Sequence, residues 1–408
     1  YLQALTSRAV VIKWEASAPS TGVVTLRGPS GAPREVKTGE KLEFHALDVA
    51  GLEPKTAYAY ELKVGDASPV SGKFVTAPEG DESFTFFAYG DSRDDHRAHE
   101  AIVGRMQQSP GDFLVNTGDM VGEGSSASDW RDFFRIEGPM LRDRAVFACV
   151  GNHELIGVSG SPPWLRYFHP GAPKGDNRRG LFHTMRWGNT RFFFLNAMVP
   201  WETGDDVTWI QEELARAEAE AGLAHRIVVM HHGPSSSGPH GPNETLRRMK
   251  INELFRNKKV DLVLAGHDHF YERGDLDGVK YLITGGAGAP LYPPKRRLQA
   301  ATLAIESSHH FVEVSVAGPK ISFVARRADG STLEACDVEK AGFTCQTALP
   351  LPRRDPPSKP ATGAPEPPKK RDCDCGVPGA RSDDGGQASL LALGIGLAAV
   401  ARGARRRR

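Results

Sequence analysis

Four short apolar runs in this chain each end in a polar cluster that contains glycine, and this pattern limits the possible fold. The clearest run, residues 145–150, is followed by Gly151-Asn152-His153-Glu154. Three others end likewise, in Gly90-Asp91-Ser92-Arg93, in Asn116-Thr117-Gly118-Asp119 and in Gly266-His267-Asp268-His269. Such runs are typical of strands buried on both faces, and open α/β sheets gather their ligands at the carboxyl ends of these strands. We therefore predict an α/β domain with one functional site at its strand ends.

Strands and helices are expected to alternate from residue 83 onwards, which favours sheets covered by helices. In residues 205–221, Val207, Ile210, Leu214 and Ala217 recur at helical spacing. Further helices are expected over 95–108, 129–136 and 244–255. Further strands are expected over 191–195, 227–230, 281–284, 311–316 and 321–325. This domain should occupy residues 82–345.

Residues 1–78 contain only β-rich runs with Gly and Pro between them, which predicts a small all-β sandwich. The runs are 9–14, 22–26, 41–47, 57–62 and 73–75. None of them carries polar residues at catalytic spacing, so we interpret this domain as structural or as a docking module. Residues 76–81 should form the hinge.

The chain after residue 345 has no pattern of a packed domain. Residues 346–372 are rich in proline and should form an extended linker. Residues 373–408 combine Cys373 and Cys375 with an apolar run at 388–401 and a terminal arginine cluster. As a helix that run would span about 21 Å, which is short of a bilayer core. The order of parts instead predicts a carboxy-terminal sorting and anchor segment, with a disordered tail as the alternative.

Charge and cysteine content restrict the partners and the compartment. A net charge of +1 argues against nucleic acid as a stable partner, because the basic footprint of a phosphate-backbone binder is missing. Cys149 lies in an apolar run and should be a buried free thiol. Cys336 and Cys345 could form a disulfide beyond the last strands if the compartment is oxidising.

The polar clusters hold the residue types that bind metal ions. Carboxylates, an amide and imidazoles, without any thiolate, suit divalent or trivalent ions such as Fe, Zn or Mn. There are more candidates than one tetrahedral ion can use, and one carboxylate can bridge, so two ions are expected. The candidate metal ligands are Asp91, Asp119, Asn152, His231, His267 and His269.

These clusters, in this order, resemble the motifs of the calcineurin-like metallophosphoesterase superfamily, and together with residues 1–78 they are most similar to its purple acid phosphatase branch. The resemblance covers residues 1–345 and implies a two-sheet αββα sandwich preceded by the all-β sandwich. Residues 52–60 resemble a strand entry of fibronectin type III-like modules. Residues 373–408 resemble the sorting signals of myxobacterial surface proteins.

The resemblance also implies a role for each site residue. Asp119 would bridge both ions, Asp91 and His269 would bind the first, and a metal-bridging hydroxide would attack the phosphorus in line. His153 would contact the phosphate or protonate the leaving group, and Glu154 would hold its imidazole. His240 would contact the substrate. The second ion would bind Asn152, His231 and His267.

The sequence departs from the family pattern at the first ion. Gly122 stands where purple acid phosphatases have a tyrosine, so the protein should not be purple, and Arg93 stands where the wider superfamily has a histidine. Either water or one of His96 and His99 would complete this site. Arg93 is better suited to binding phosphate. His232 could compete with His231 for the second ion, although the motif spacing favours His231.

We therefore expect a secreted or cell-surface phosphomonoesterase that acts on small phosphate esters and touches a membrane only through its tail. One alternative is a phosphodiesterase or nucleotidase, which depends on loops such as 177–183 and 235–242. Another is a surface binding protein with little catalytic activity. The sequence makes no prediction of oligomeric state.

Overall fold

The computed structural model describes residues 1–29, 31–159, 163–168, 181–198 and 204–350. Every described residue lies in one compact unit, which is bounded by Tyr1 and Ala364. The predicted sorting segment and most of the predicted linker lie outside the described residues. Within the described part, no helix is long and apolar enough to cross a membrane.

The amino-terminal part is all-β, as predicted. Its strands form one sheet in the order β1-β2-β5 and a second in the order β4-β3-β6-β7. Alternate residues such as Val24, Leu26 and Phe74 are buried, because successive side chains of a strand face opposite sides. The strands are β1 (Leu2–Gln3), β2 (Ala9–Ser20), β3 (Gly22–Arg27), β4 (Arg34–Lys37), β5 (Leu42–Ala50), β6 (Ala57–Val64) and β7 (Val70–Val75).

The following part contains two larger sheets, here called sheet I and sheet II. Sheet I has the order β10-β9-β8-β18-β19-β20-β21, and its first three strands run parallel. Its strands are β8 (Phe84–Tyr89), β9 (Phe113–Asn116), β10 (Ala145–Ala148), β18 (His310–Ala317), β19 (Lys320–Arg327), β20 (Thr332–Glu339) and β21 (Gly342–Thr347).

Sheet II has the order β11-β12-β13-β14-β16-β15-β17. Four of its strands run parallel, namely β12, β13, β14 and β16. Their carboxyl ends therefore lie at the same edge of the sheet, and the polar clusters follow at this edge. Its strands are β11 (His183–Trp187), β12 (Thr190–Leu195), β13 (His225–Met230), β14 (Leu262–Ala265), β15 (Tyr271–Leu276), β16 (Val279–Thr284) and β17 (Thr302–Glu306).

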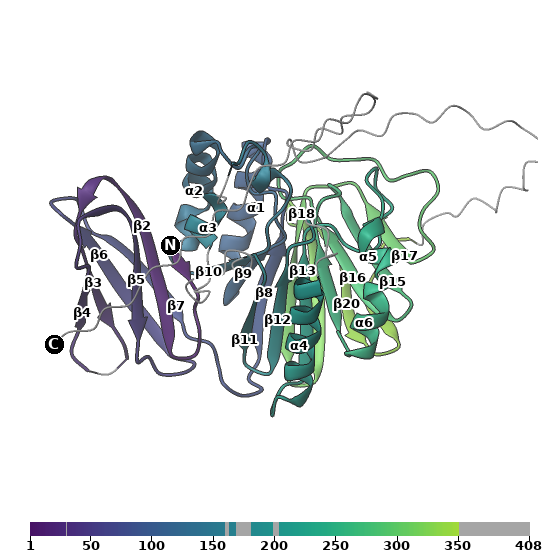
Figure 1. Cartoon of the computed structure of the whole chain (residues 1–408), viewed down its shortest axis with the longest axis horizontal. Helices are drawn as coiled ribbons and strands as arrows, with labels where there is room; N and C mark the ends of the chain where they lie inside the picture. The colour runs from purple at the N-terminus through teal and green to yellow at the C-terminus, as the bar shows by residue number, and fades with distance from the viewer. Residues whose placement is uncertain (30, 160–162, 169–180, 199–203, 351–408) are drawn as a thin grey trace, which may run out of the picture. The chain divides into compact units, whose positions relative to one another are not determined.

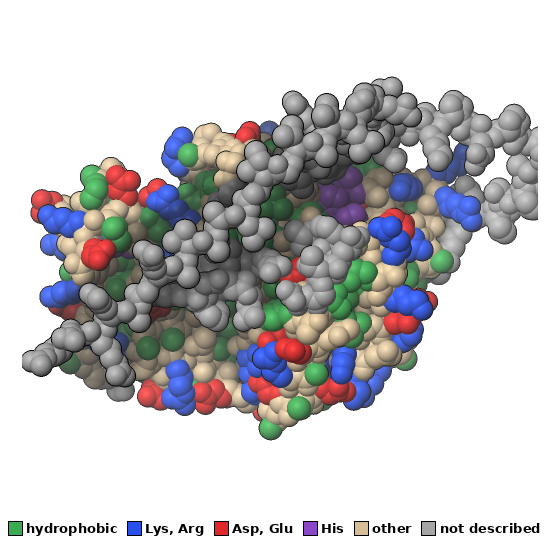
Figure 2. Space-filling model, in the orientation of Figure 1, with side chains coloured by type: hydrophobic (Ala, Val, Ile, Leu, Met, Phe, Trp, Pro, Cys, Tyr) green, Lys and Arg blue, Asp and Glu red, His purple; other side chains and the backbone are tan. Residues whose placement is uncertain are grey.

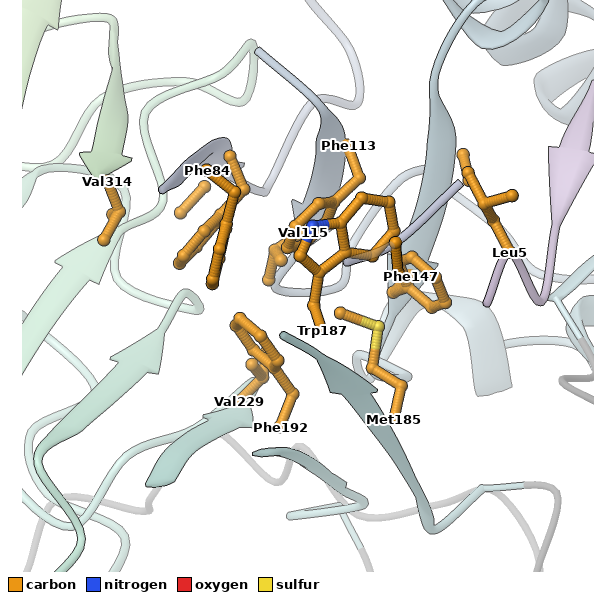
Figure 3. Close-up of a cluster of buried hydrophobic side chains, with 14 of the residues drawn as sticks. Leu5, Phe84, Phe113, Val115, Phe147, Met185, Trp187, Phe192, Val229 and Val314 are labelled. Atoms are coloured by element: carbon orange, nitrogen blue, oxygen red, sulfur yellow. The ribbon is translucent and has the colours of Figure 1, made fainter. Parts of the chain in front are cut away.

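The two sheets pack face to face through large apolar side chains (Figure 3). Phe113 of sheet I lies 5.6 Å, centroid to centroid, from Phe192 of sheet II and 4.3 Å from Trp187. A second apolar cluster joins sheet I to α1 (His96–Gln108), α2 (Ala127–Leu141) and α3 (Pro163–Phe168). A third joins sheet II to α4 (Gly204–Ala219), α5 (Glu244–Arg248) and α6 (Ile251–Asn257) (Figure 1). This is the predicted αββα sandwich.

Two local predictions were wrong. The helix expected over 244–255 is broken, because Lys250 adopts a left-handed conformation with φ of 54° between α5 and α6. Strands β20 and β21 were not predicted. The predicted disulfide between Cys336 and Cys345 is confirmed, but the two cysteines lie opposite each other inside this hairpin rather than beyond the last strands. Cys149 is a buried free thiol, as predicted.

A buried ion pair links the two sheets at β15 and β20. Arg273 donates from Nε and Nη2 to the carboxylate of Glu334 at 2.8 and 3.0 Å, and the Tyr271 hydroxyl donates to the same carboxylate at 2.8 Å. The Glu334 side chain is fully buried. Loss of one partner therefore leaves a charge without compensation inside the protein.

We expect Glu334→Gln to lower the free energy of unfolding by about 3–5 kcal/mol, the cost of breaking a buried charge pair. Urea denaturation followed by fluorescence measures this change. Glu212→Gln is the control, since Glu212 pairs with Arg216 on the exposed face of α4 and should change stability by less than about 1 kcal/mol. Equal effects of the two substitutions would contradict the structural role of the pair.

A buried histidine should make the fold sensitive to acid. Burial lowers the pKa of His310 to about 4, and its Nδ1 faces the Ser308 carbonyl at 2.9 Å. Its unfolded pKa is about 6.5, so the unfolded chain binds a proton first as the pH falls, and stability is lost between pH 6.5 and 4 by on the order of 3 kcal/mol. His310→Phe cannot titrate, so its urea midpoint should fall less than that of the wild type between pH 7.5 and pH 5. Parallel declines would refute this assignment.

Candidate metal centre

The strand ends of both sheets place the polar clusters beside one another. Asp91 follows β8, Asp119 follows β9, and Asn152 begins the 3-10 turn (His153–Leu155) after β10. His231 follows β13, and His267 and His269 follow β14. Histidine side chains gather at one place on the face shown in Figure 2.

Three of the candidate ligands adopt a backbone conformation that non-glycine residues rarely use. The φ angles are 56° for Asp91, 55° for Asp119 and 72° for His267. Such positions cost on the order of 1–3 kcal/mol and persist where surrounding contacts impose them. Here the His267 amide donates to both carboxylate oxygens of Asp91 at 3.1 Å. The strained turns therefore direct backbone and side chains at one centre.

Glycine occurs in these clusters because backbone and carboxylate approach closely. A Cβ atom on Gly151 would overlap a carboxylate oxygen of Asp119, and one on Gly266 would overlap a carboxylate oxygen of Asp91. Any larger residue would push the carboxylates out of place.

The described residues form two groups of ligand atoms at this centre, and the two groups share Asp119. One contains Asp91, Asp119 and His269, and the other contains Asp119, His231 and His267, with all ligand atoms of a group within 4.8 Å of one another. The amide oxygen of Asn152 lies 3.1 Å from Nε2 of His231, beside the second group. The structure thus brings all six candidate ligands close to one another.

Backbone carbonyls orient the imidazoles. Nδ1 of His231 lies 2.8 Å from the Thr117 carbonyl, and Nδ1 of His269 lies 2.7 Å from the Pro290 carbonyl. A carbonyl only accepts, so each Nδ1 carries the proton and Nε2 is left as the ligand atom. His232 instead directs its Nε2 to the Gly241 carbonyl at 2.9 Å, which agrees with His231 as the ligand.

The electrostatics of the centre fit a bound cation. Burial raises the pKa of Asp91 to about 8, with the neighbouring Asp119 charge adding to the effect and His231 opposing it. Two buried carboxylates in one place are costly unless positive charge compensates them. Oxygen and imidazole donors without thiolates suit Fe, Zn or Mn, so the residues present fit two such ions.

Arg93 and His153 flank the two groups. Arg93 Nε lies 3.6 Å from Asp119 Oδ2, and Arg93 Nη2 lies 3.4 Å from His269 Nε2. His153 Nδ1 lies 2.6 Å from the Gly122 carbonyl, and its Nε2 lies 3.8 Å from Asp119 Oδ2. Both side chains are partly exposed, at 11% and 21%, so a ligand at the centre can reach them.

Glu154 has a different contact from the one predicted. It is fully buried and accepts hydrogen bonds from the backbone amides of Asp119, Met120 and Gly151 at 2.9, 2.7 and 2.7 Å. The expectation that it holds the His153 imidazole is wrong, because the Gly122 carbonyl has that position. Glu154 instead fastens the turn after β9 to the turn after β10.

Neither nearby histidine of α1 joins the ligand groups of the described residues. His96 is exposed at the start of the helix. His99 is buried, with Nε2 2.9 Å from Glu137 Oε1, and Glu137 also accepts from the Tyr89 hydroxyl at 2.6 Å. His99 therefore links α1 to α2 and β8 through Glu137, and it is not part of the metal centre.

Two residues near the centre were not recognised in the sequence. The ring of Tyr292 stacks on His269, with centroids 4.1 Å apart, although it lies in an irregular loop without a motif. Asp268 accepts from His240, whose Nδ1 lies 2.8 Å from Asp268 Oδ1, and the His240 ring lies 4.2 Å from that of His267. The position of Asp268 between the candidate ligands His267 and His269 was the sequence signal that could have identified it.

Comparison with known proteins agrees with this geometry. Residues 84–271 match the model of the calcineurin-like phosphoesterase family. An uncharacterised protein of Mycobacterium tuberculosis is 26% identical over 278 residues, which are 59% of this chain and 52% of that protein. Purple acid phosphatase 5 of Arabidopsis thaliana is 22% identical over 293 residues, which are 69% of this chain and 68% of that protein. The chain spans about half the length of the Mycobacterium protein.

Solved structures show the same fold. A purple acid phosphatase from yellow lupin seeds superimposes with a TM-score of 0.71 at 16% identity. The superposition covers 85% of this chain and 73% of the lupin chain. The structure of PhoD superimposes with a TM-score of 0.62 at 11% identity, and the superposition covers 86% of this chain and 92% of the PhoD chain. The fold and the paired ligand groups define a metallophosphoesterase domain. Residues 84–271 are similar to the calcineurin-like phosphoesterase family, and purple acid phosphatases are among the relatives of the chain.

Proposed function

We propose that this protein hydrolyses phosphate monoesters at a dinuclear metal site, in the manner of an acid phosphatase. The observation that carries the proposal is the pair of ligand groups that share Asp119, built from the strand ends of both sheets. Similarity to purple acid phosphatases and to the phosphoenolpyruvate phosphatase of Allium cepa, which is 26% identical over 259 residues, supports a phosphate ester as substrate.

Two ions held here would lower the pKa of water and clamp the attacking and leaving oxygens of an in-line displacement. The protein residues supply the rest. The Arg93 guanidinium can bind two oxygens of a phosphoryl group, and its ion pairs with Asp94 and Asp119 keep it at the centre. The carbonyl of Gly122 fixes the ring of His153, so that Nε2 faces the space near Asp119 where a phosphate or its leaving group would lie.

The test measures metal content and turnover of the full chain with an aryl phosphate and with a bis-aryl phosphate. We expect two metals per chain, preference for the monoester, loss of turnover after chelation and recovery when the metal is restored. Preference for the diester would support the alternative of a phosphodiesterase or nucleotidase. Fewer than two metals and no turnover of either ester would refute the enzyme and favour a surface binding protein.

We also propose that the protein is secreted and held at the cell surface through residues 373–408. The disulfide between Cys336 and Cys345 supports this, since such bonds form in oxidising compartments. Protease added to intact cells of the native host should digest the protein, because it would lie on the cell surface. Protection from protease together with recovery in the soluble intracellular fraction would contradict the proposal.

A further inference from the structure

The loop 235–242 contacts the metal centre through the buried carboxylate of Asp268. Asp268 is 1% exposed and lies between the candidate ligands His267 and His269. His240 approaches it twice, since its backbone amide lies 3.3 Å and its Nδ1 lies 2.8 Å from Asp268 Oδ1. Asp268 therefore fixes both the position and the rotation of the His240 ring.

Two further residues of the loop, Ser236 and Gly238, lie against the same carboxylate. The Ser236 hydroxyl donates to the other oxygen of Asp268, and the Gly238 amide donates to the Ser236 hydroxyl at 3.0 Å. A Cβ atom on Gly238 would overlap the Asp268 carboxylate. Residue 238 must therefore be glycine for the loop to close over Asp268.

The ring of His240 is held at the open side of the centre. Its side chain is 31% exposed, and its centroid lies 4.2 Å from that of His267 and 5.5 Å from that of Tyr292. Because a carboxylate only accepts, Nδ1 carries a proton and Nε2 is the ring atom left for a ligand. This arrangement places one defined nitrogen beside the metal ligands.

We propose that Asp268 is a positioning residue that holds His240 with Nε2 directed at the phosphate ester. The proposal rests on the proposed phosphatase function, and it adds a residue that acts on the substrate through His240. It makes a specific energetic prediction, because removing Asp268 should cost nothing further once His240 is absent.

A double-mutant cycle tests this. We expect His240→Ala and Asp268→Ala each to lower kcat/KM for an aryl phosphate by about 10- to 100-fold, as is typical when a residue that orients the site is lost. The double variant should match His240→Ala alone, with metal content unchanged throughout. Asp268→Asn keeps an acceptor oxygen for Nδ1 and should lie between the wild type and Asp268→Ala. Additive losses, or equal losses in the Asn and Ala variants, would overturn the proposal.

A second measurement does not depend on turnover. Nitrogen-15 NMR of the imidazoles in the metal-loaded protein, assigned with His240→Ala, should show His240 protonated at Nδ1 in the wild type, and this preference should be lost in Asp268→Ala. Asp132→Asn, on the exposed side of α2, is the matched control and should leave the His240 signals unchanged. A His240 tautomer that is unaffected by Asp268→Ala would refute the proposal even if the protein hydrolyses phosphate esters. Conversely, the expected tautomer in a protein without turnover would refute only the proposed function.

Discussion

Asp119→Asn is expected to lower phosphomonoester turnover by more than about 100-fold and to remove both metal ions. Asp119 is the ligand that the two groups share, and its two carboxylate oxygens lie 3.3 Å from His231 Nε2 and 3.6 Å from Arg93 Nε. An amide keeps the shape but removes the charge that both ions need, so the loss should exceed the 10- to 100-fold typical of residues that only orient a ligand. Metal analysis and kcat/KM for an aryl phosphate measure the effect.

Asp91→Asn is the informative comparison. Asp91 belongs only to the group with His269, so its loss should release one ion and leave the other bound. Asp132→Asn controls for loss of an acidic side chain elsewhere and should retain two ions and full activity. The bridging assignment would be wrong if Asp119→Asn and Asp91→Asn each retained one ion.

The fold and the clustering of the candidate ligands could be predicted because their causes are local. Buried parallel strands need continuous apolar runs, and a strand that ends at a site needs a tight turn, so glycine and ligand appear together, as in Gly266-His267. Where a local signal was weak, the prediction failed. Lys250 breaks a helix without a glycine or proline to mark the position, and the β20–β21 hairpin has exposed polar positions that hide its alternation.

The contacts that orient the ligands could not be predicted, because most of their partners are backbone groups. The carbonyls of Thr117 and Pro290 fix two imidazoles, and every residue type has a carbonyl. Tyr292 reaches His269 only through the path of an irregular loop. A sequence motif thus identifies which residues meet, while the rotation of each ring depends on backbone atoms that carry no sequence signal.

Glu154 is the clearest case, and its replacement should have a large effect on stability. Its Oε2 accepts from the amides of Asp119 and Gly151, and its Oε1 accepts from the amide of Met120. Glutamine has one carbonyl oxygen, so in Glu154→Gln the new NH2 group must face at least one buried amide donor. Leaving a buried donor without an acceptor costs about 1–3 kcal/mol, and losing a charge-assisted bond adds to this. We expect the free energy of unfolding of the metal-free protein to fall by about 2–4 kcal/mol.

Metal affinity should fall with stability, because the turn that Glu154 fastens carries Asp119 itself. Glu123→Gln is the matched control, since Glu123 is exposed in the same turn and bonds to the Ser125 hydroxyl. Urea denaturation and metal titration of both variants separate the two possible roles of Glu154. If Glu154 acted on the His153 imidazole, turnover would fall while unfolding and metal binding stayed unchanged. The three amide contacts require the opposite order, in which stability and metal affinity are lost and the decline in turnover follows from them.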